Sequence, residues 1–474
     1  MLSYATTPQE VFPSGPHFSK TGKSRSATVY IGGKPPYRDG PIIFPAGRHR
    51  RNIIAIAVLA RSLSPCSACL SVIGVIDMRP SSVSYQLAAF LIAAARRNTP
   101  LSLPSATIPT ATLYFIKTFK SSLAMSHNIL ITGASGYLGG TLLNRLGEAN
   151  LPPYGKLFAL IRTDDQAEKA KKLYGAEPLR FDAYNEDAVL EALRSHHITV
   201  VYHLIDPRTE VSQLAFIKAL GEVKKQTGSE VHFLHTTGAK IFSSHADAPT
   251  DRPLLDTDPE LYHIQKSQKP SNEFFQAAVA TNNLVIEQAE VHGVQAYIFA
   301  PCIVYGQGEG FGNVISIQTV AVVRAAKGAG RVYRTDQGQP TWPVCHVYDN
   351  TTLYISLLRA ILNGAKPDHG RNGYYLASSG SVVWDDLYSA IAKSLKQRGV
   401  IGDDTVATAD KAALEEMGKA LGCPASFVPI MVGGKCTFVA ERANKKLGWQ
   451  AKYSPEHVLE NADAEVELIL KNLK

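Results

Sequence analysis

The sequence predicts an α/β fold in which a doubly wound parallel sheet is followed by a smaller C-terminal lobe. Between residues 128 and 300, apolar runs of strand length alternate with helical stretches, a pattern typical of a parallel sheet with helices on both faces. A glycine turn directly follows the first run. Residues 380–470 contain helical stretches with ordinary apolar spacing, which indicates a small helical lobe.

The elements follow one another in a regular order along the chain. The expected strands are residues 128–132, 156–161, 177–180, 199–204, 230–235 and 294–300. The expected helices are residues 187–194, 214–227, 272–291, 315–327, 384–398, 410–422 and 454–473. The strands are short, and most of them are apolar.

The charge of the chain is divided unevenly. The net charge is +8, but residues 1–124 hold 14 of the 49 Lys and Arg residues and only 3 of the 41 acidic residues. The remainder is mildly acidic, with 35 basic and 38 acidic residues. No nucleic-acid partner is therefore expected for that part.

Residues 1–124 show neither strand nor helix periodicity. Three interpretations stand beside one another: a targeting sequence, a disordered tail, or a wrongly assigned extension before a true start at Met125, which we favour. The apolar stretches are shorter than the about 18–20 residues that span a bilayer, so no membrane association is expected. The lone Cys66-x-x-Cys69 pair has no partner pair at zinc spacing, and no metal site is expected. We expect a cytoplasmic protein, with mitochondrial targeting by this segment left open.

The glycine turn carries the strongest functional signal. Gly133 permits a tight turn after the strand, Gly136 lets the backbone approach a pyrophosphate, and Gly139 permits close packing of helix on strand. The helix that follows directs its free N–H groups at the phosphates. Residues 125–300 are therefore predicted to be an NAD(P)-binding Rossmann domain, and residues 301–474 a substrate-binding lobe with a return to the sheet.

The second strand indicates which dinucleotide is preferred. Arg162 stands where an acidic residue would bind the ribose 2′-hydroxyl of NAD, and it offers a forked cation to the 2′-phosphate of NADP. Asp164 and Asp165 nearby oppose a phosphate. NADP is thus favoured modestly over NAD. Asp182, after the third strand, is expected to contact the adenine.

Several segments together resemble a known family, the extended short-chain dehydrogenase/reductases of the NAD-dependent epimerase/dehydratase group. The segments are TGASGYLGG, FALIR, VYHLI, HTTGAKIF, PCIVYGQGEG and NKKLGWQAKY. The resemblance spans roughly residues 127–470, with Ala300 where the family usually has Arg. It implies that the cofactor contacts Gly133, Ser135, Gly136, Tyr137, Leu138, Gly139, Arg162, Asp182, Leu204 and Pro301.

The resemblance also implies hydride transfer, with Thr237 binding the reacting oxygen, Tyr262 as general acid/base and Lys266 lowering its pKa. Tyr262 follows Thr237 by 25 residues, a typical interval, and Thr257–Glu260 is a plausible capping box for a helix that begins there. The 35 residues from Lys266 to Pro301 are roughly ten too many. Counting back along the later helix places Phe274 and Ala278 at the family's tyrosine and lysine positions.

Two functions remain open at this point. The first is an NAD(P)-dependent oxidoreductase or epimerase acting on a small molecule, such as a secondary metabolite or a sugar derivative. The second is an inactive NADP-binding regulator that has lost its tyrosine. The flexible loop 306–313 is expected to meet the substrate through Phe311 and Asn313. A homodimer is left open.

Overall fold

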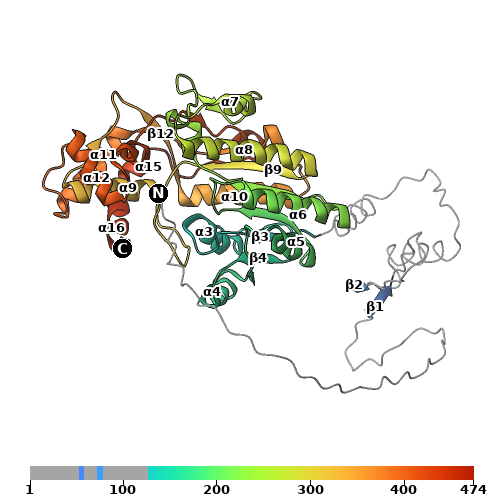
Figure 1. Ribbon diagram of the computed structural model, residues 1–474. Coiled ribbons are helices and arrows are strands. Elements are labelled where there is room, and N and C mark those ends of the chain that lie inside the picture. The colour runs from blue at the N-terminus through green and yellow to red at the C-terminus, as the bar shows by residue number, and fades with distance from the viewer. Residues whose placement is uncertain (1–52, 58–71, 78–125, 474) are drawn as a thin grey trace, which may run out of the picture. The chain divides into compact units, whose positions relative to one another are not determined.

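The computed structural model describes residues 53–57, 72–77 and 126–473 (Figure 1). The chain separates into two compact units, one of which is Thr7–Ser121. In that unit the described residues form two antiparallel strands, β1 (Ile53–Ala57) and β2 (Val72–Asp77). The three interpretations of residues 1–124, as a targeting sequence, a disordered tail or a wrongly assigned extension, concern mainly residues that lie outside the described ones.

The larger unit is built on a seven-stranded sheet whose neighbouring strands are all parallel, in the order β13-β9-β7-β6-β3-β4-β5. The strands are β3 (Asn128–Ile131), β4 (Leu157–Leu160), β5 (Glu177–Leu179), β6 (Ile198–His203), β7 (His232–Thr236), β9 (Gln295–Pro301) and β13 (Tyr374–Ala377). The sheet confirms the predicted doubly wound Rossmann fold. Six of its strands were predicted, and β13 was missed.

Helices cover both faces of this sheet. On one face α5 (Glu186–Ser195), α6 (Val211–Thr227) and α8 (Glu273–His292) pack side by side. On the other lie α3 (Tyr137–Leu146), α4 (Asp164–Tyr174) and α10 (Val347–Leu362). Along β6, Val201 joins the core under the first set, whereas Val200 and Tyr202 join the core under the second. Every residue of β6 is buried, as expected of a strand that helices cover on both faces.

The C-terminal residues form a lobe of helices with one small sheet (Figure 1). The sheet joins β10 (Ile303–Tyr305), β12 (Thr341–His346) and β14 (Gly380–Val383). The helices are α9 (Gln318–Ala329), α11 (Trp384–Gln397), α12 (Lys411–Leu421), α13 (Val428–Val432), α15 (His457–Glu460) and α16 (Ala462–Asn472). Helix α14 (Arg442–Leu447) instead packs beside β13 and α10 of the large sheet. Two further strand pairs are β11 (Tyr333–Arg334) with β15 (Ala407–Thr408), and β8 (Leu254–Leu255) with β16 (Phe438–Val439). No helix within the described residues is long and apolar enough to cross a membrane.

One short segment, Ile430–Gly434, holds the lobe to the rest of the unit. Each of its five successive carbonyl oxygens accepts a hydrogen bond from a side chain elsewhere in the fold. The donors, in order, are Lys240 Nζ, Gln318 Nε2, the Tyr388 hydroxyl, His245 Nε2 and Trp384 Nε1. They come from the segment after β7, from α9 and from α11, so this pinned segment fixes the lobe over the carboxyl end of β7.

Candidate dinucleotide-binding and active site

The glycine turn lies where the strand order of the sheet reverses, between β3 and β6. Gly133 has a φ of +69°, and a Cβ there would lie 2.8 Å from the Leu204 carbonyl oxygen. The Leu204 amide donates to Thr132 Oγ1 at 2.7 Å. The ends of β3 and β6 are therefore locked together at the crevice where open α/β sheets bind ligands.

The start of α3 is shaped to receive an anion. A Cβ on Gly139 would come within 2.4 Å of the Gly133 carbonyl oxygen, so only glycine allows this helix to approach the strand. Gly136 is the N-cap, and it provides no side-chain hydrogen bond to the first turn. The N–H groups of Tyr137 and Leu138 begin a helix of ten residues with no acidic side chain in its first turn. This arrangement fits a dinucleotide pyrophosphate.

The loop 306–313 lies against this turn. The Tyr137 hydroxyl donates to the Gly306 carbonyl at 2.7 Å, and the Gly312 amide donates to the Ser135 carbonyl at 2.9 Å. A Cβ on Gly310 would lie 2.1 Å from the Gly136 carbonyl oxygen. Two glycines of the loop, Gly310 and Gly312, are thus required by close contact with the backbone of the glycine turn.

The two residues of this loop that were expected to meet the substrate also contact neighbouring protein groups. The Phe311 ring stacks on Tyr174 of α4, with ring centroids 5.7 Å apart. Asn313 Oδ1 accepts the Ile315 amide at 3.1 Å. The Phe311 ring thus packs within the protein, whereas Asn313 is exposed and its contact with the substrate stays a prediction.

The end of β4 presents a cation that has no ion-pair partner within the part of the chain that the structure describes. Arg162 is exposed, and its backbone N–H donates to Gln166 Oε1 at 2.8 Å. The two acids that were expected to oppose a phosphate are paired elsewhere. Asp164 contacts Arg180 at 3.2 Å, and Asp165 contacts Lys169 at 2.9 Å. Their charges are therefore partly compensated beside Arg162.

The remaining cofactor residues of the prediction lie at the carboxyl ends of strands. Asp182 follows β5, is exposed, and accepts the Tyr184 amide at 2.9 Å. Pro301 is the buried last residue of β9. Because carboxyl ends of parallel strands share one edge of a sheet, Leu204 and Pro301 lie at the edge that carries the glycine turn.

Thr237 directly follows β7 at this same edge. Its amide donates to the Phe299 carbonyl at 2.8 Å, which fixes the backbone beside β9. The neighbouring Thr236 hydroxyl is hydrogen-bonded to the Tyr354 hydroxyl at 2.9 Å and is buried. Of the two threonines, Thr237 is the one that is only half-buried and so accessible to a ligand.

Tyr262 and Lys266 lie together on α7 (Leu261–Ser267), as their spacing predicts. The Lys266 ammonium donates to the Tyr262 hydroxyl at 3.3 Å. Both groups also bond to Glu287 of α8, and the Tyr262 hydroxyl donates to its carboxylate at 2.7 Å. The predicted capping box is absent, because Thr257 instead donates to Glu441.

The contact with Glu287 places this pair away from Thr237. Helix α8 leads directly into β9, so the C-terminal half of α8 lies toward the amino edge of the sheet. Glu287 is in that half. Arg371, which lies over the Tyr262 ring at 4.8 Å, comes just before β13 and so also lies at the amino edge. The structure therefore joins Tyr262 to Lys266 but not to the glycine turn.

The surroundings of Tyr262 shift its pKa away from the range that a general base needs. Burial, followed by the hydrogen bond to Glu287, raises the pKa of Tyr262, and the opposing effect of Lys266 is smaller. A tyrosine that accepts protons near neutrality needs the opposite shift. Phe274 and Ala278 occupy the first turns of α8, nearest the carboxyl edge. Neither side chain can carry a proton.

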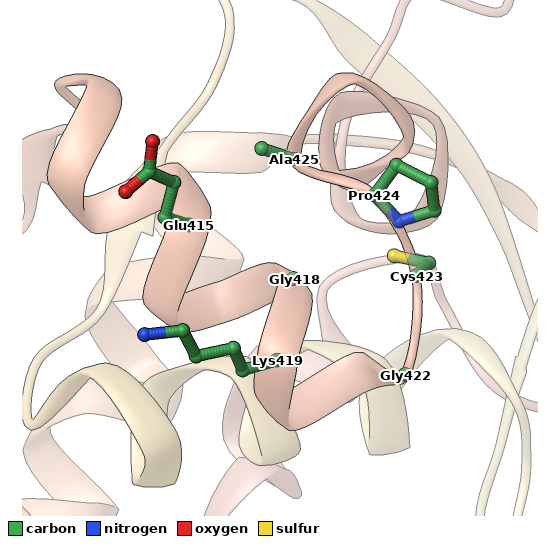
Figure 2. A pocket seen from close by; sticks show the side chains of 7 residues that line it. All are labelled: Glu415, Gly418, Lys419, Gly422, Cys423, Pro424 and Ala425. Atoms are coloured by element: carbon green, nitrogen blue, oxygen red, sulfur yellow. The ribbon is translucent and has the colours of Figure 1, made fainter.

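An open hollow of about 390 Å³ lies in the C-terminal lobe, around the end of α12 (Figure 2). Figure 2 shows Cys423 and Pro424 on the turn that follows the helix, with Glu415 and Lys419 on the helix itself. The lining is Glu415, Gly418, Lys419, Gly422, Cys423, Pro424 and Ala425. It includes no residue of the glycine turn or of a sheet strand, so it is separate from the candidate site.

The sequence matches the model of the NAD-dependent epimerase/dehydratase family over residues 129–370. The chain belongs to this family. Membership confirms the resemblance and the prediction of an NAD(P)-dependent enzyme of the epimerase/dehydratase type. No curated protein matches the chain.

Solved structures of this family are similar in fold. The dTDP-glucose 4,6-dehydratase from Bacillus anthracis, solved in complex with NAD, is 11% identical, with a TM-score of 0.50 over 73% of this chain and 98% of that one. The UDP-glucose 4-epimerase from Thermotoga maritima, solved with UDP-glucose, is 16% identical, with a TM-score of 0.49 over 73% and 100%. The dehydratase structure agrees with the Rossmann-type sheet found here.

Proposed function

We propose that this family member binds NADP and transfers hydride between its nicotinamide and a small-molecule substrate. The observation that carries the proposal is the uncapped N-terminus of α3 at the reversal of strand order, where Gly133 and Gly139 admit no side chain. That geometry serves any dinucleotide phosphate. The choice of NADP rests on Arg162 and its surroundings.

Arg162 and Arg180 support the preference for a 2′-phosphate. They follow the neighbouring strands β4 and β5, so both cations lie at the edge where the adenosine half of a dinucleotide would rest. Asp164 forms an ion pair with Arg180, so its negative charge is partly compensated and opposes a phosphate at Arg162 less. Arg162 is left to bind phosphate in its forked geometry.

Replacing Arg162 tests the cofactor assignment. We expect Arg162→Asp to weaken NADPH binding about tenfold or more, because a hydrogen bond to a charged group contributes on the order of 1.5–3 kcal/mol. NADH binding should stay equal or improve. Fluorescence titration with both cofactors measures the shift. Arg194→Asp, at the exposed end of α5, is the matched control and should leave both affinities unchanged. Equal affinity of the parent protein for both cofactors would reject the NADP assignment.

Substrate would lie between the glycine turn and the C-terminal lobe, next to Thr237. The bound dinucleotide supplies or accepts the hydride. We assign the Thr237 hydroxyl to hydrogen-bond the reacting oxygen, because its backbone is fixed beside β9 at this edge and its side chain is only half-buried. The pinned segment Ile430–Gly434 holds the lobe over the same edge. We propose a neutral or sugar-derived substrate. The loop 306–313, which follows β10, contains no arginine that could act as a clamp, and its glycines are in close contact with other parts of the protein.

Tyr262→Phe distinguishes a catalytic tyrosine from a packing one. The position of Tyr262 favours packing, so we expect NADPH affinity and cofactor-dependent turnover to match the parent. The free energy of unfolding should fall by about 0.5–1.5 kcal/mol, since one hydrogen bond to Glu287 is lost. Denaturant titration and NADPH oxidation measure the two quantities. Lys266→Ala serves as the companion variant. A fall in turnover of about 10²–10⁴-fold in Tyr262→Phe would restore the tyrosine as the acid/base.

A further inference from the structure

A cluster of polar side chains is buried behind Thr237, on the face of the sheet covered by α6 and α8. His203 ends β6, His235 lies on β7, Asn282 on α8 and Gln265 on α7, and all four are fully buried. The two imidazole rings lie 6.0 Å apart between centroids. Gln265 Oε1 accepts the Asn282 amide at 3.3 Å, which joins the two helices.

Several hydrogen-bonding atoms of this cluster have no partner among the described residues. They are His203 Nδ1, both ring nitrogens of His235, Asn282 Oδ1 and Gln265 Nε2. Of the four ring nitrogens of His203 and His235, His203 Nε2 alone has a partner among the described residues, the Ser212 hydroxyl at 2.7 Å. After burial, an interaction with the Asn282 side chain is the next largest influence on the pKa of His235 and raises it, so the two side chains lie close together although no well-aligned hydrogen bond joins them. Unpaired buried polar atoms are rare in folded proteins and are costly.

The protonation state of the two imidazole rings determines which kind of ligand can hydrogen-bond to both of them. Burial lowers the pKa of His235 to about 4 and the pKa of His203 well below its usual value. Each ring therefore offers one donor and one acceptor near neutrality. His235 needs both an acceptor and a donor, Asn282 Oδ1 needs a donor, and Gln265 Nε2 needs an acceptor. An anion or a cation would satisfy only one kind of atom.

Water is the small ligand that matches this mixture, because one molecule donates two hydrogen bonds and accepts two. We propose that internal water binds between His203, His235 and Asn282 as a fixed part of the structure. Phe216 and Phe233 flank His203, with ring centroids 5.6 Å away in each case, so apolar walls separate this water from solvent.

The water site lies close to Thr237, the residue to which the proposed function gives a role in the reaction. His235 and Thr237 are two residues apart at the end of β7, so their side chains point toward the same face of the sheet. The site thus lies directly behind the hydroxyl assigned to the reacting oxygen. This role rests on the proposed function, whereas the binding of water does not.

A crystal structure of the full chain at a resolution that reveals ordered water tests the proposal. We expect a water oxygen within hydrogen-bond distance of a His235 ring nitrogen and of Asn282 Oδ1. Direct bonding between these side chains, with no water among them, would overturn it. NADPH titration of the same protein is independent, so failure of cofactor binding would reject the proposed function and leave the water site standing.

Thermal unfolding of three variants gives a second test in solution. If the site is hydrated, His235→Phe should lower the melting temperature, because the water loses a partner, and His235→Gln should restore most of the loss. If the site is dry, His235→Phe should raise the melting temperature, because an unpaired polar ring has been removed. His232→Phe on the same strand is the control, since that ring is already hydrogen-bonded to the Tyr297 hydroxyl at 3.0 Å and its loss should be destabilising in both cases.

Discussion

Gly139→Ala is expected to abolish the dinucleotide site while leaving the sheet assembled. The new Cβ would lie 2.4 Å from the Gly133 carbonyl oxygen and 2.9 Å from the Gly133 carbonyl carbon, and both atoms belong to the backbone. The helix must move away from the strand, at a cost of about 1–3 kcal/mol in the free energy of unfolding. Its N–H groups then leave the phosphates, so NADPH affinity should fall about tenfold or more.

Gly147→Ala provides the matched control in the same helix. Gly147 caps the C-terminus of α3 with a right-handed φ of −61°, and a Cβ there meets no atom within 4 Å. Alanine should therefore be neutral or slightly stabilising, because it restricts the unfolded chain. Denaturant titration and NADPH binding should be measured on both variants. If Gly139→Ala binds NADPH as well as Gly147→Ala does, the close approach of α3 to β3 is not needed for cofactor binding.

Asp256→Ala is expected to be the most destabilising single change away from the cofactor. The fully buried Asp256 carboxylate accepts the backbone amides of Leu376, Glu441 and Arg442, at 3.3, 2.9 and 2.7 Å. These amides belong to β13 and to the start of α14, so one side chain joins the edge of the sheet to the C-terminal region. Leaving such groups unpaired in the interior costs about 1–3 kcal/mol each, and we expect a loss of about 3–5 kcal/mol overall.

The matched control for this change is Asp251→Ala, which removes an exposed carboxylate from the same connecting segment. Substitutions at such surface positions usually change stability by less than about 0.5 kcal/mol. Urea unfolding of the two variants measures the difference. A loss below about 1 kcal/mol for Asp256→Ala would mean that solvent reaches these amides and takes over their hydrogen bonds.

Local sequence signals were sufficient for most of the sheet. β6 and β9 are buried along their whole length, so their apolar runs stand out from the helices on either side. β13 was missed because its four residues, Tyr374–Ala377, follow a short 3₁₀ turn and carry no period of their own. Their place beside β9 depends on contacts with residues about 75 positions earlier in the chain, such as Tyr374 with Ile298.

The candidate site was predictable where its chemistry is local and not where it depends on distant partners. The glycine turn could be predicted directly from the spacing of Gly133, Gly136 and Gly139. Gly133 and Gly139 are each required by a close contact within the turn or with an adjacent strand. Tyr262 and Lys266 were paired correctly with each other, since their spacing fixes one helical face. Their common partner, Glu287, lies on a separate helix, and no spacing rule indicates the end of the sheet to which that helix brings them.

The pinned segment Ile430–Gly434 has a consequence for the order in which the chain folds. Its carbonyl groups find their donors on side chains that lie between about 40 and 190 residues earlier in the sequence. Closing such long loops is entropically unfavourable until the donors are already in place. The segment should therefore dock late, after the sheet and α11 have formed. Hydrogen exchange during refolding should find the amides of β6 and β7 protected before the lobe becomes fixed above them.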